Sequence, residues 1–309
     1  MPKKILTIGE LLWDLLPDQM VLGGAPANFS YRINNLGFVS YLVTRLGRDD
    51  MGKKAFEILK RQGVNTQFIQ WDDHHPTGTV NVFFDSDNHP DYEIIKHVAY
   101  DFIEYSQVLE DLTAAVDCIY FGTLVQRSPV TKSTIDRVLD ANPDCLKFCD
   151  INLRKECFSE DTVLSSLGHA NILKLNENET YSLKEILNMH AENLHEICRE
   201  LVEHYSLECC ITTLEERGAL ACDKNGGIIY SPGFKTRPVD SLGAGDAFSA
   251  AFIEQYMTHG NLDEACEYGN ILGAIVTTQK GATQPISDED IQQFRLNKYD
   301  RCFDHRIKN

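Results

Sequence analysis

Short apolar runs that alternate with amphipathic helical patterns are the feature that most restricts how this chain can fold. The runs have the length and composition of buried strands, and they lie at Lys4–Ile8, Ser40–Thr44, Cys118–Phe121, Leu146–Asp150, Ile172–Leu175 and Cys209–Thr213. Between the first of them, Ala27–Leu36 and Met51–Gln62 have helical spacing of apolar residues, and a glycine follows each. This alternation predicts a mostly parallel sheet covered by helices, an α/β fold.

One segment departs from the alternation and predicts a separate hairpin. Thr77–Phe84 has the pattern of a strand, 85–88 (Asp-Ser-Asp-Asn) is a turn signal, and Asp91–Ile95 has the pattern of a returning strand. Such an inserted hairpin is either a lid over a site at the sheet edge or an element without a role in the site. A second hairpin is predicted where 223–227 forms a turn signal and Ile228–Tyr230 the returning arm.

The net charge disfavours two classes of partner. The 309 residues carry a formal charge of −17 at pH 7, so the phosphates of nucleic acid or of an anionic membrane would be repelled. A phosphate site in this chain must therefore be built locally, from backbone N–H groups and a few basic side chains.

Cysteine usage and the apolar runs indicate a cytoplasmic protein. The ten cysteines lie between Cys118 and Cys302 without a Cys-x-x-Cys pair, which favours reduced thiols over a disulfide framework or a metal site. No run reaches the roughly 18 apolar residues of a membrane span. The first ten residues contain no apolar segment of the length found in secretory signals.

The strongest local signal lies in the segment 239–252. Gly243, Ala244 and Gly245 allow a tight turn that presents N–H groups in a row, and the apolar residues after them continue as a buried helix. Amides at a helix N-terminus bind anions and suit the charge that develops on a transferred phosphoryl group. Asp246 either complements the helix dipole or takes a proton from the attacking hydroxyl. Because an acid is a poor phosphate ligand but a good base, the second interpretation is favoured.

A second glycine-rich turn opens the helix predicted at Ala27. Gly23 and Gly24 let a ligand approach the backbone, and Asn28 offers a donor and an acceptor to hydroxyl groups. The alternative is an ordinary helix N-terminus with loop glycines. Upstream, Asp14 follows the first strand, where an open α/β sheet places ligand contacts, although a surface acid is the simpler interpretation of this residue alone.

Two familiar phosphate motifs are absent. The segment 47–54 nearly matches a P-loop, but Lys54 stands where Ser or Thr is required, and Asp49 and Asp50 would face the phosphates. No Gly-x-Gly-x-x-Gly follows the first strand, so the dinucleotide fingerprint is missing.

Taken together, these residues resemble the ribokinase/PfkB family of carbohydrate kinases, and its fructokinase branch in particular. The resemblance covers essentially the whole chain in the family's order. The turn at 23–28 is similar to the fructokinase form of the first family signature, and 243–246 (Gly-Ala-Gly-Asp) resembles the second. Further matches lie at Gly9-Glu10 with Asp14, and at 45–52, 150–154 (Asp-Ile-Asn-Leu-Arg) and 176–179 (Asn-Glu-Asn-Glu).

The resemblance implies a single ribokinase-like α/β domain over residues 1–309, with a small β-sheet lid built from segments near 11–22 and 76–105. The sugar would lie under this lid, in contact with Asp14, Gly23, Gly24, Asn28 and Asp246. Asp246 would be the base, and the anion hole would be formed by Gly243, Ala244 and Gly245. Lid strands in this family often pair between subunits, which suggests a homodimer.

The resemblance also implies where cofactors would bind. ATP would contact Asn176, Thr213, Gly218, Asn270 and Arg154. Glu179 would hold Mg²⁺ through water, and a monovalent cation such as K⁺ would lie at Asp240, the Leu242 carbonyl and Gly281. Two positions depart from the family pattern: Leu242 replaces a hydroxyl residue, and Glu215 replaces a glycine of the nucleotide loop.

We therefore expect ATP-dependent phosphorylation of a sugar hydroxyl, with fructose as the favoured acceptor. A 2-keto-3-deoxygluconate, a nucleoside or another hexose is an alternative acceptor for the same chemistry. A catalytically weak sugar-binding regulator is the alternative from a different class, suggested by Leu242 and Glu215.

Overall fold

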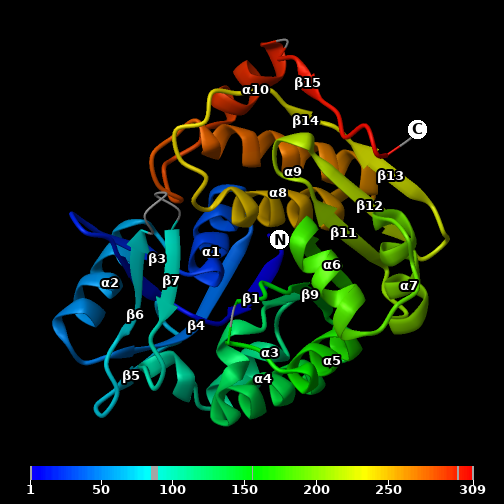
Figure 1. Ribbon diagram of the computed structural model, residues 1–309. Coiled ribbons are helices and arrows are strands. Elements are labelled where there is room, and N and C mark those ends of the chain that lie inside the picture. Colours follow the sequence, from blue (N-terminus) through cyan, green and yellow to red (C-terminus); the bar gives the residue numbers. More distant parts are fainter. Residues whose placement is uncertain (1, 85–89, 155, 298, 308–309) are drawn as a thin grey trace.

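A large central sheet organises the chain, of which the computed structural model describes residues 2–84, 90–154, 156–297 and 299–307 (Figure 1). Within these ranges the sheet has nine strands in the order β13-β12-β11-β10-β9-β8-β1-β4-β5. The strands from β11 to β5 are parallel to their neighbours, and β12 and β13 are antiparallel. Their bounds are β1 Lys4–Ile8, β4 Val39–Gly47, β5 Ile69–Asp72, β8 Cys118–Phe121, β9 Leu146–Asp150, β10 Ile172–Asn176, β11 Cys209–Thr213, β12 Ala219–Asp223 and β13 Ile228–Ser231.

Helices cover both faces of this sheet because successive strand residues point to opposite sides. In β8, Phe121 packs toward one helix layer, whereas Tyr120 packs toward the other. The first layer is α3 Gln107–Thr113, α4 Pro129–Ala141, α5 Glu160–His169, α6 Glu177–Ile186 and α7 Leu194–Tyr205. The second layer includes α1 Ala25–Asn35, α8 Ala244–His259 and α9 Leu262–Thr277. The remaining helices are α2 Asp50–Arg61, beside β4 and β5, and α10 Asp288–Leu296.

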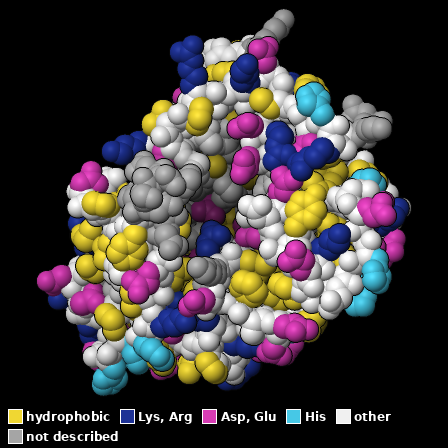
Figure 2. Space-filling view, in the orientation of Figure 1, with side chains coloured by type: hydrophobic (Ala, Val, Ile, Leu, Met, Phe, Trp, Pro, Cys, Tyr) yellow, Lys and Arg dark blue, Asp and Glu magenta, His cyan; other side chains and the backbone are white. Residues whose placement is uncertain are grey.

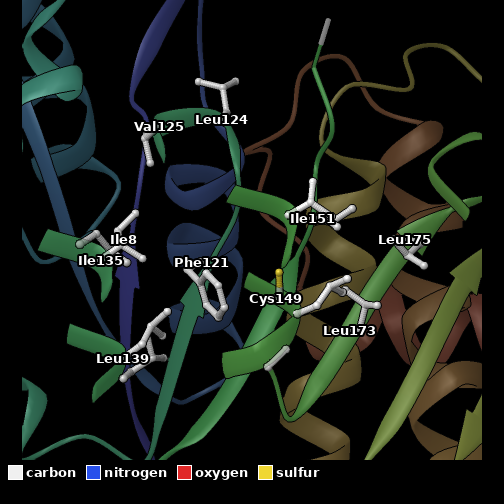
Figure 3. Packing of buried hydrophobic residues seen from close by; sticks show 14 of the residues in the cluster. Ile8, Phe121, Leu124, Val125, Ile135, Leu139, Cys149, Ile151, Leu173 and Leu175 are labelled. Carbon is white, nitrogen blue, oxygen red and sulfur yellow. The ribbon is translucent and has the colours of Figure 1, made fainter. Parts of the chain in front are cut away.

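Figure 3 shows the core under the first layer, where Ile8, Phe121, Cys149 and Leu173 of neighbouring strands meet Ile135 and Leu139 of α4. Ile8, Phe121, Cys149 and Leu173 are fully buried. All ten cysteines are free, and all but Cys302 are buried. None of the helices in the described part of the chain has the length and apolar character needed to cross a membrane.

The predicted strands are confirmed, and the two predicted helices begin one or two residues earlier than expected. The helix expected at Ala27 starts at Ala25, because Pro26 is accommodated in a first turn, where its missing N–H has no cost. The helix expected at Met51 starts at Asp50, because the Asp49 side chain caps it by accepting from the Gly52 N–H at 2.7 Å. Asp49 also accepts from the Thr77 hydroxyl at 2.7 Å and from its N–H at 2.8 Å, which ties α2 to the start of the hairpin.

A small second sheet contains strands from two segments of the chain. The residue pattern predicted one hairpin of this sheet, and the resemblance predicted it as a lid. Its order is β3-β2-β6-β7, with β2 parallel to β6 and the other pairs antiparallel. The bounds are β2 Leu12–Leu15, β3 Met20–Gly23, β6 Gly78–Phe84 and β7 Pro90–Ile94. The turn predicted at 85–88 lies outside the described residues. The second predicted hairpin is formed by β12 and β13, where Asp223 accepts from the Asn225 and Gly227 N–H groups. A short pair, β14 Gly233–Phe234 and β15 Arg301–Cys302, joins the C-terminal segment to the rest of the chain.

Candidate active site

Asn28 and Asp246 lie in the first turns of α1 and α8, and Arg154 and Asn176 lie at the carboxyl ends of β9 and β10. This is the edge of an open α/β sheet at which ligands bind. Figure 2 shows a hollow in this face of the molecule, with acidic and basic side chains in its floor. The small sheet lies beside it (Figure 1).

The turn before α8 has a backbone that only glycine fits. Gly243 has φ 76°, and a Cβ placed on it would lie 2.3 Å from the Cβ of Ala282. No side chain of the described residues caps the first turn of α8. The Ala244 N–H, expected to face a phosphoryl group, donates instead to the Ser241 carbonyl at 3.2 Å. The predicted anion hole therefore rests on the other amides around Gly245.

Asp246 lies in the first turn of α8 and is held by a residue far away in the sequence. The Asn28 Nδ2 of α1 donates to Asp246 Oδ2 at 2.8 Å, so the two glycine-rich turns meet at this contact. Burial raises the pKa of Asp246 to about 6, with a further contribution from the Asp150 carboxylate. Asn28, Lys174 and Arg154 act in the opposite direction. A half-buried carboxylate with this pKa is largely ionised at neutral pH and can accept a proton.

The two glycines before α1 leave room for neighbouring groups. Gly24 has φ 116°, and a Cβ on it would lie 2.5 Å from the Glu10 carbonyl oxygen. A Cβ on Gly23 would lie 2.7 Å from Asp14 Oδ2. Asp14 is a β2 residue opposite Val21, and burial raises its pKa to about 6. The structure thus brings Asp14, Gly23, Gly24, Asn28 and Asp246 to one side of the site.

Glu10 is a residue of this region that was named from the sequence only within a family match and was given no role in the site. Its side chain is buried, and burial raises its pKa to about 7, with the charge of Asp246 adding to the effect. The sequence signal for Glu10 was its position, because it is an acidic residue that directly follows a buried strand and a glycine. Together with Asp14 and Asp246, it makes this side of the site acidic.

Arg154 follows β9 and is the basic side chain that faces these carboxylates. Its positive charge lowers the pKa of four carboxyl groups and so partly offsets the effect of their burial. These groups belong to Glu10, Asp14, Asp246 and Glu179. Its Nη1 lies 4.0 Å from Glu179 Oε1, and about half of the side chain is exposed. Arg154, predicted as a cofactor residue, therefore acts on the carboxylates of Glu10, Asp14 and Asp246 as well as on Glu179.

Asn176 and Glu179 form a reciprocal cap at the start of α6. Asn176 Oδ1 accepts from the Glu179 N–H at 2.9 Å, and Glu179 Oε2 accepts from the Asn176 N–H at 2.8 Å. Glu179 Oε1 accepts from the Leu153 N–H at 3.1 Å. Mg²⁺ prefers oxygen ligands and keeps several of its waters. Because both oxygens of Glu179 are already engaged, this buried carboxylate fits a contact with Mg²⁺ through water.

The three residues predicted to contact nucleotide elsewhere have structural partners of their own. Thr213 donates its hydroxyl to the Leu175 carbonyl at 3.2 Å. A Cβ on Gly218, which has φ 96°, would lie 2.1 Å from the Ser231 carbonyl oxygen. Asn270 is buried and donates to the carbonyl and hydroxyl oxygens of Ser231, both at 3.0 Å. Glu215 is exposed and has a positive φ, 56°, a backbone conformation that glycine adopts more readily.

Asp240 connects the turn before α8 to the loop after α9. Its Oδ1 accepts from the Leu242 N–H at 3.0 Å, and its Oδ2 accepts from the Gly281 N–H at 2.9 Å. The three residues predicted to hold a monovalent cation are thus in contact. The contacts seen at Asp240 are with backbone N–H groups, and the predicted cation would add to them.

Comparison with known proteins identifies the family. The model of the pfkB family of carbohydrate kinases matches residues 18–289. The chain belongs to this family. The predictions of a ribokinase/PfkB member, of the α/β fold and of a sugar kinase are thereby confirmed.

The similar proteins include fructokinases. Fructokinase-2 of Oryza sativa subsp. japonica is 26% identical over 96% of this chain and 95% of its own length. The fold is shared with the fructokinase of Vibrio cholerae O395 in its fructose, ADP and calcium ion bound form (TM-score 0.81, 23% identity, 94% and 98% of the two chains). It is also shared with the aminoimidazole riboside kinase of Salmonella enterica, complexed with aminoimidazole riboside and an ATP analog (TM-score 0.78, 22% identity, 94% and 99% of the chains).

Proposed function

We propose that this kinase transfers a phosphoryl group from ATP to a hydroxyl of fructose, with Asp246 as the general base. The observation that carries the proposal is the Asn28–Asp246 contact, which places an ionisable carboxylate at the meeting point of the two glycine-rich turns. The fructokinases among its relatives support fructose as the acceptor. The Vibrio cholerae structure, with fructose and ADP together, supports the pairing of sugar and adenine nucleotide.

In this mechanism the chain's own groups supply positioning and charge. Asn28 holds the Asp246 carboxylate so that one oxygen is free to accept the proton of the attacking hydroxyl. The amides around Gly245 face the phosphoryl group, and Arg154 adds positive charge near Asp246. Mg²⁺, contacted through water by Glu179, would neutralise the charge of the nucleotide phosphates. Asn176, Thr213, Gly218 and Asn270 would shape the nucleotide side, and Asp240, Leu242 and Gly281 would hold a monovalent cation.

The charges of the sugar side favour a neutral acceptor over an acidic one. Glu10, Asp14 and Asp246 face one region, where Arg154 is the basic side chain whose charge acts on all three. A 2-keto-3-deoxygluconate would bring a further carboxylate into this region, where like charges repel. A polyhydroxylated neutral sugar can accept from Asn28 and donate to Asp14. A nucleoside and another hexose stay as alternative acceptors.

A panel of acceptors tests the proposal. ADP release should require a free sugar and Mg²⁺, with fructose at or near the top of hexoses, pentoses, nucleosides and keto-deoxy acids, and K⁺ should activate more than a bulky organic cation. Equal or faster turnover of a nucleoside would reject the assignment of fructose as the acceptor and retain the assignment as a kinase. No turnover with any acceptor would favour a sugar-binding regulator.

The pH dependence of kcat/KM is a second expected result. Because Asp246 must be ionised to accept a proton and its pKa is about 6, kcat/KM should fall about tenfold per pH unit below pH 6. Asp14 has a similar pKa, so the Asp14→Asn variant provides the control. Its kcat/KM should be lower throughout but keep the same acid limb. Loss of the limb in this variant would assign the titration to Asp14.

We further propose that the chain acts as one domain over residues 1–309, with the small sheet as a lid, and that two copies pair through these lids in the cytoplasm. Met20 of β3 and Phe83 of β6 are exposed on this sheet. Light scattering of the purified protein should give twice the 35.0 kDa mass of the chain. A mass of one chain would reject the dimer.

A further inference from the structure

A buried ion pair lies under the turn at 243–246. Lys174 of β10 and Asp150 of β9 are directly opposite in the parallel register, and both side chains are buried. The Lys174 Nζ lies 3.1 Å from each carboxylate oxygen of Asp150. Both residues lie near the carboxyl ends of their strands, the edge at which the site is built.

Asp150 connects this pair to the first turn of α8. The Ser249 hydroxyl of α8 lies 2.9 Å from Asp150 Oδ2 and 3.0 Å from the Gly245 carbonyl oxygen. The Tyr120 hydroxyl of β8 donates to the same carboxylate at 3.2 Å. The Tyr120 ring stacks on Phe29, the neighbour of Asn28, with the ring centroids 3.9 Å apart. The network thus reaches both turns that meet at Asp246.

The ammonium of Lys174 lies close to the backbone of Gly245. A Cβ placed on Gly245 would be 3.4 Å from Nζ. Burial alone would lower the pKa of Lys174, but Asp150, Glu179 and Asp246 together raise it, so the side chain stays charged. A fixed positive charge therefore lies beneath the amides that face the phosphoryl group.

Stability alone does not explain a charged pair at this place. Replacing a buried ion pair by apolar residues of similar volume is often neutral or stabilising, because two charges must lose their water. In this site the pair has a second effect. Asp150 and Asp246 are like charges within reach of each other, and Lys174 offsets their repulsion.

We propose that Lys174 is a positioning residue of phosphoryl transfer: its ammonium, held by Asp150, balances the negative charge of Asp246 and supports the turn beneath the transferred group. This inference rests on the proposed function. The charged or titratable groups that face Asp246 are Asp150 of β9, Lys174 of β10, Arg154 after β9, Glu10 after β1 and Tyr120 of β8. Asn28 of α1 donates to it.

Removing each partner of the pair should move the acid limb of kcat/KM in opposite directions. In Lys174→Met the limb should shift upward by about one pH unit, because Asp246 loses a nearby positive charge. In Asp150→Asn it should shift downward by a similar amount, because Asp246 loses a nearby negative charge. The rate at pH 8 should fall at least tenfold in Lys174→Met, through the disturbed turn. A merely structural pair would lower stability in both variants without opposite shifts.

Lys147 provides a matched control. It is a buried lysine of the neighbouring strand, and its Nζ contacts the carbonyl oxygens of Asn142, Pro143 and Cys145. Lys147→Met should cost stability as Lys174→Met does, with an unchanged acid limb. Where a single variant of the pair does not fold, Asp150→Asn/Lys174→Met removes both charges together. Its acid limb should lie near that of the wild type, and its rate should stay below that of Lys147→Met. A rate equal to that of the control would overturn the inference.

An NMR titration separates this inference from the proposed function. With aspartate labelled at the ¹³Cγ position, the Asp246 signal is the one missing in Asp246→Asn. Its midpoint should rise in Lys174→Met and fall in Asp150→Asn whether or not a sugar is turned over. Unchanged midpoints in an active enzyme would reject the role of Lys174 and leave the kinase assignment intact. If the midpoints shift but the protein phosphorylates no acceptor, the proposed function is rejected. The electrostatic effect of Lys174 and Asp150 on Asp246 is then all that is retained.

Discussion

Replacing Asp246 by Asn should abolish turnover while the protein stays folded. The substitution keeps the size of the side chain and an oxygen that can accept from Asn28, but an amide cannot take a proton from the attacking hydroxyl. Loss of a general base typically costs on the order of 10²–10⁴ in rate, or roughly 3–5 kcal/mol of barrier. We expect kcat to fall by this factor, measured as ADP release with saturating sugar and ATP.

Thermal unfolding of the same variant distinguishes the base from a helix-dipole residue. Because the folded protein raises the pKa of Asp246, ionising it above pH 6 costs stability, so Asn should leave Tm unchanged or slightly higher at pH 8. If the carboxylate only complemented the helix dipole, Asp246→Asn would lower the free energy of unfolding by up to about 1 kcal/mol and leave kcat unchanged. A variant that retains more than about a tenth of wild-type kcat would exclude Asp246 as the base. Calorimetry should still show sugar and ATP binding.

Replacing Gly243 by Ala should damage the site nearly as much. The new methyl group would lie 2.3 Å from the Ala282 Cβ and 2.8 Å from its Cα, so the turn must move. Displacing a donor from an anion hole typically costs about 10²–10³ in kcat. The left-handed backbone adds roughly 1–2 kcal/mol of strain, which unfolding in denaturant would measure.

Gly260 at the other end of α8 is the matched control for this variant. It also has a positive φ, 69°, but a Cβ on it would meet nothing within 4 Å. Gly260→Ala should therefore lose a similar backbone contribution to stability and keep kcat. Equal activity in the two variants would mean that the turn at Gly243 makes no contribution to phosphoryl transfer.

The elements that the sequence predicted best are those whose residue pattern follows directly from burial on two faces. β8, β9 and β11 match their predicted bounds because strands covered by helices on both sides are continuous apolar runs. The small sheet was harder to predict, because β2 and β3 are short and because β2 pairs with β6, more than 50 residues later in the chain. The hairpin pattern at Thr77 indicated one half of it alone.

Side-chain partners across the site could be predicted least. Asn28 and Asp246 were both singled out, but their contact links positions 218 residues apart, which no local pattern specifies. Lys174 in the apolar run Ile-Leu-Lys-Leu was a signal of a buried charge. Its role could not be predicted from this run, because its partner Asp150 lies on another strand. Gly218 and Asn270 were taken as nucleotide residues, and their contacts with Ser231 emerge only from the packing of β13 against its neighbours.

The strand order carries a consequence for how the chain assembles on the ribosome. β1 lies inside the sheet, with β4 and β5 on one side of it. After β8 has joined its other side, each new strand from β9 to β13 is added outward in the order in which it is synthesised. The N-terminal part of a chain is available to fold first during synthesis, and in a sheet with this order no strand synthesised after β8 has to be inserted between two earlier ones. Asp246 lies beyond the last of these strands, so a nascent chain arrested before α8 would display the complete nine-stranded sheet of the described residues without its proposed base.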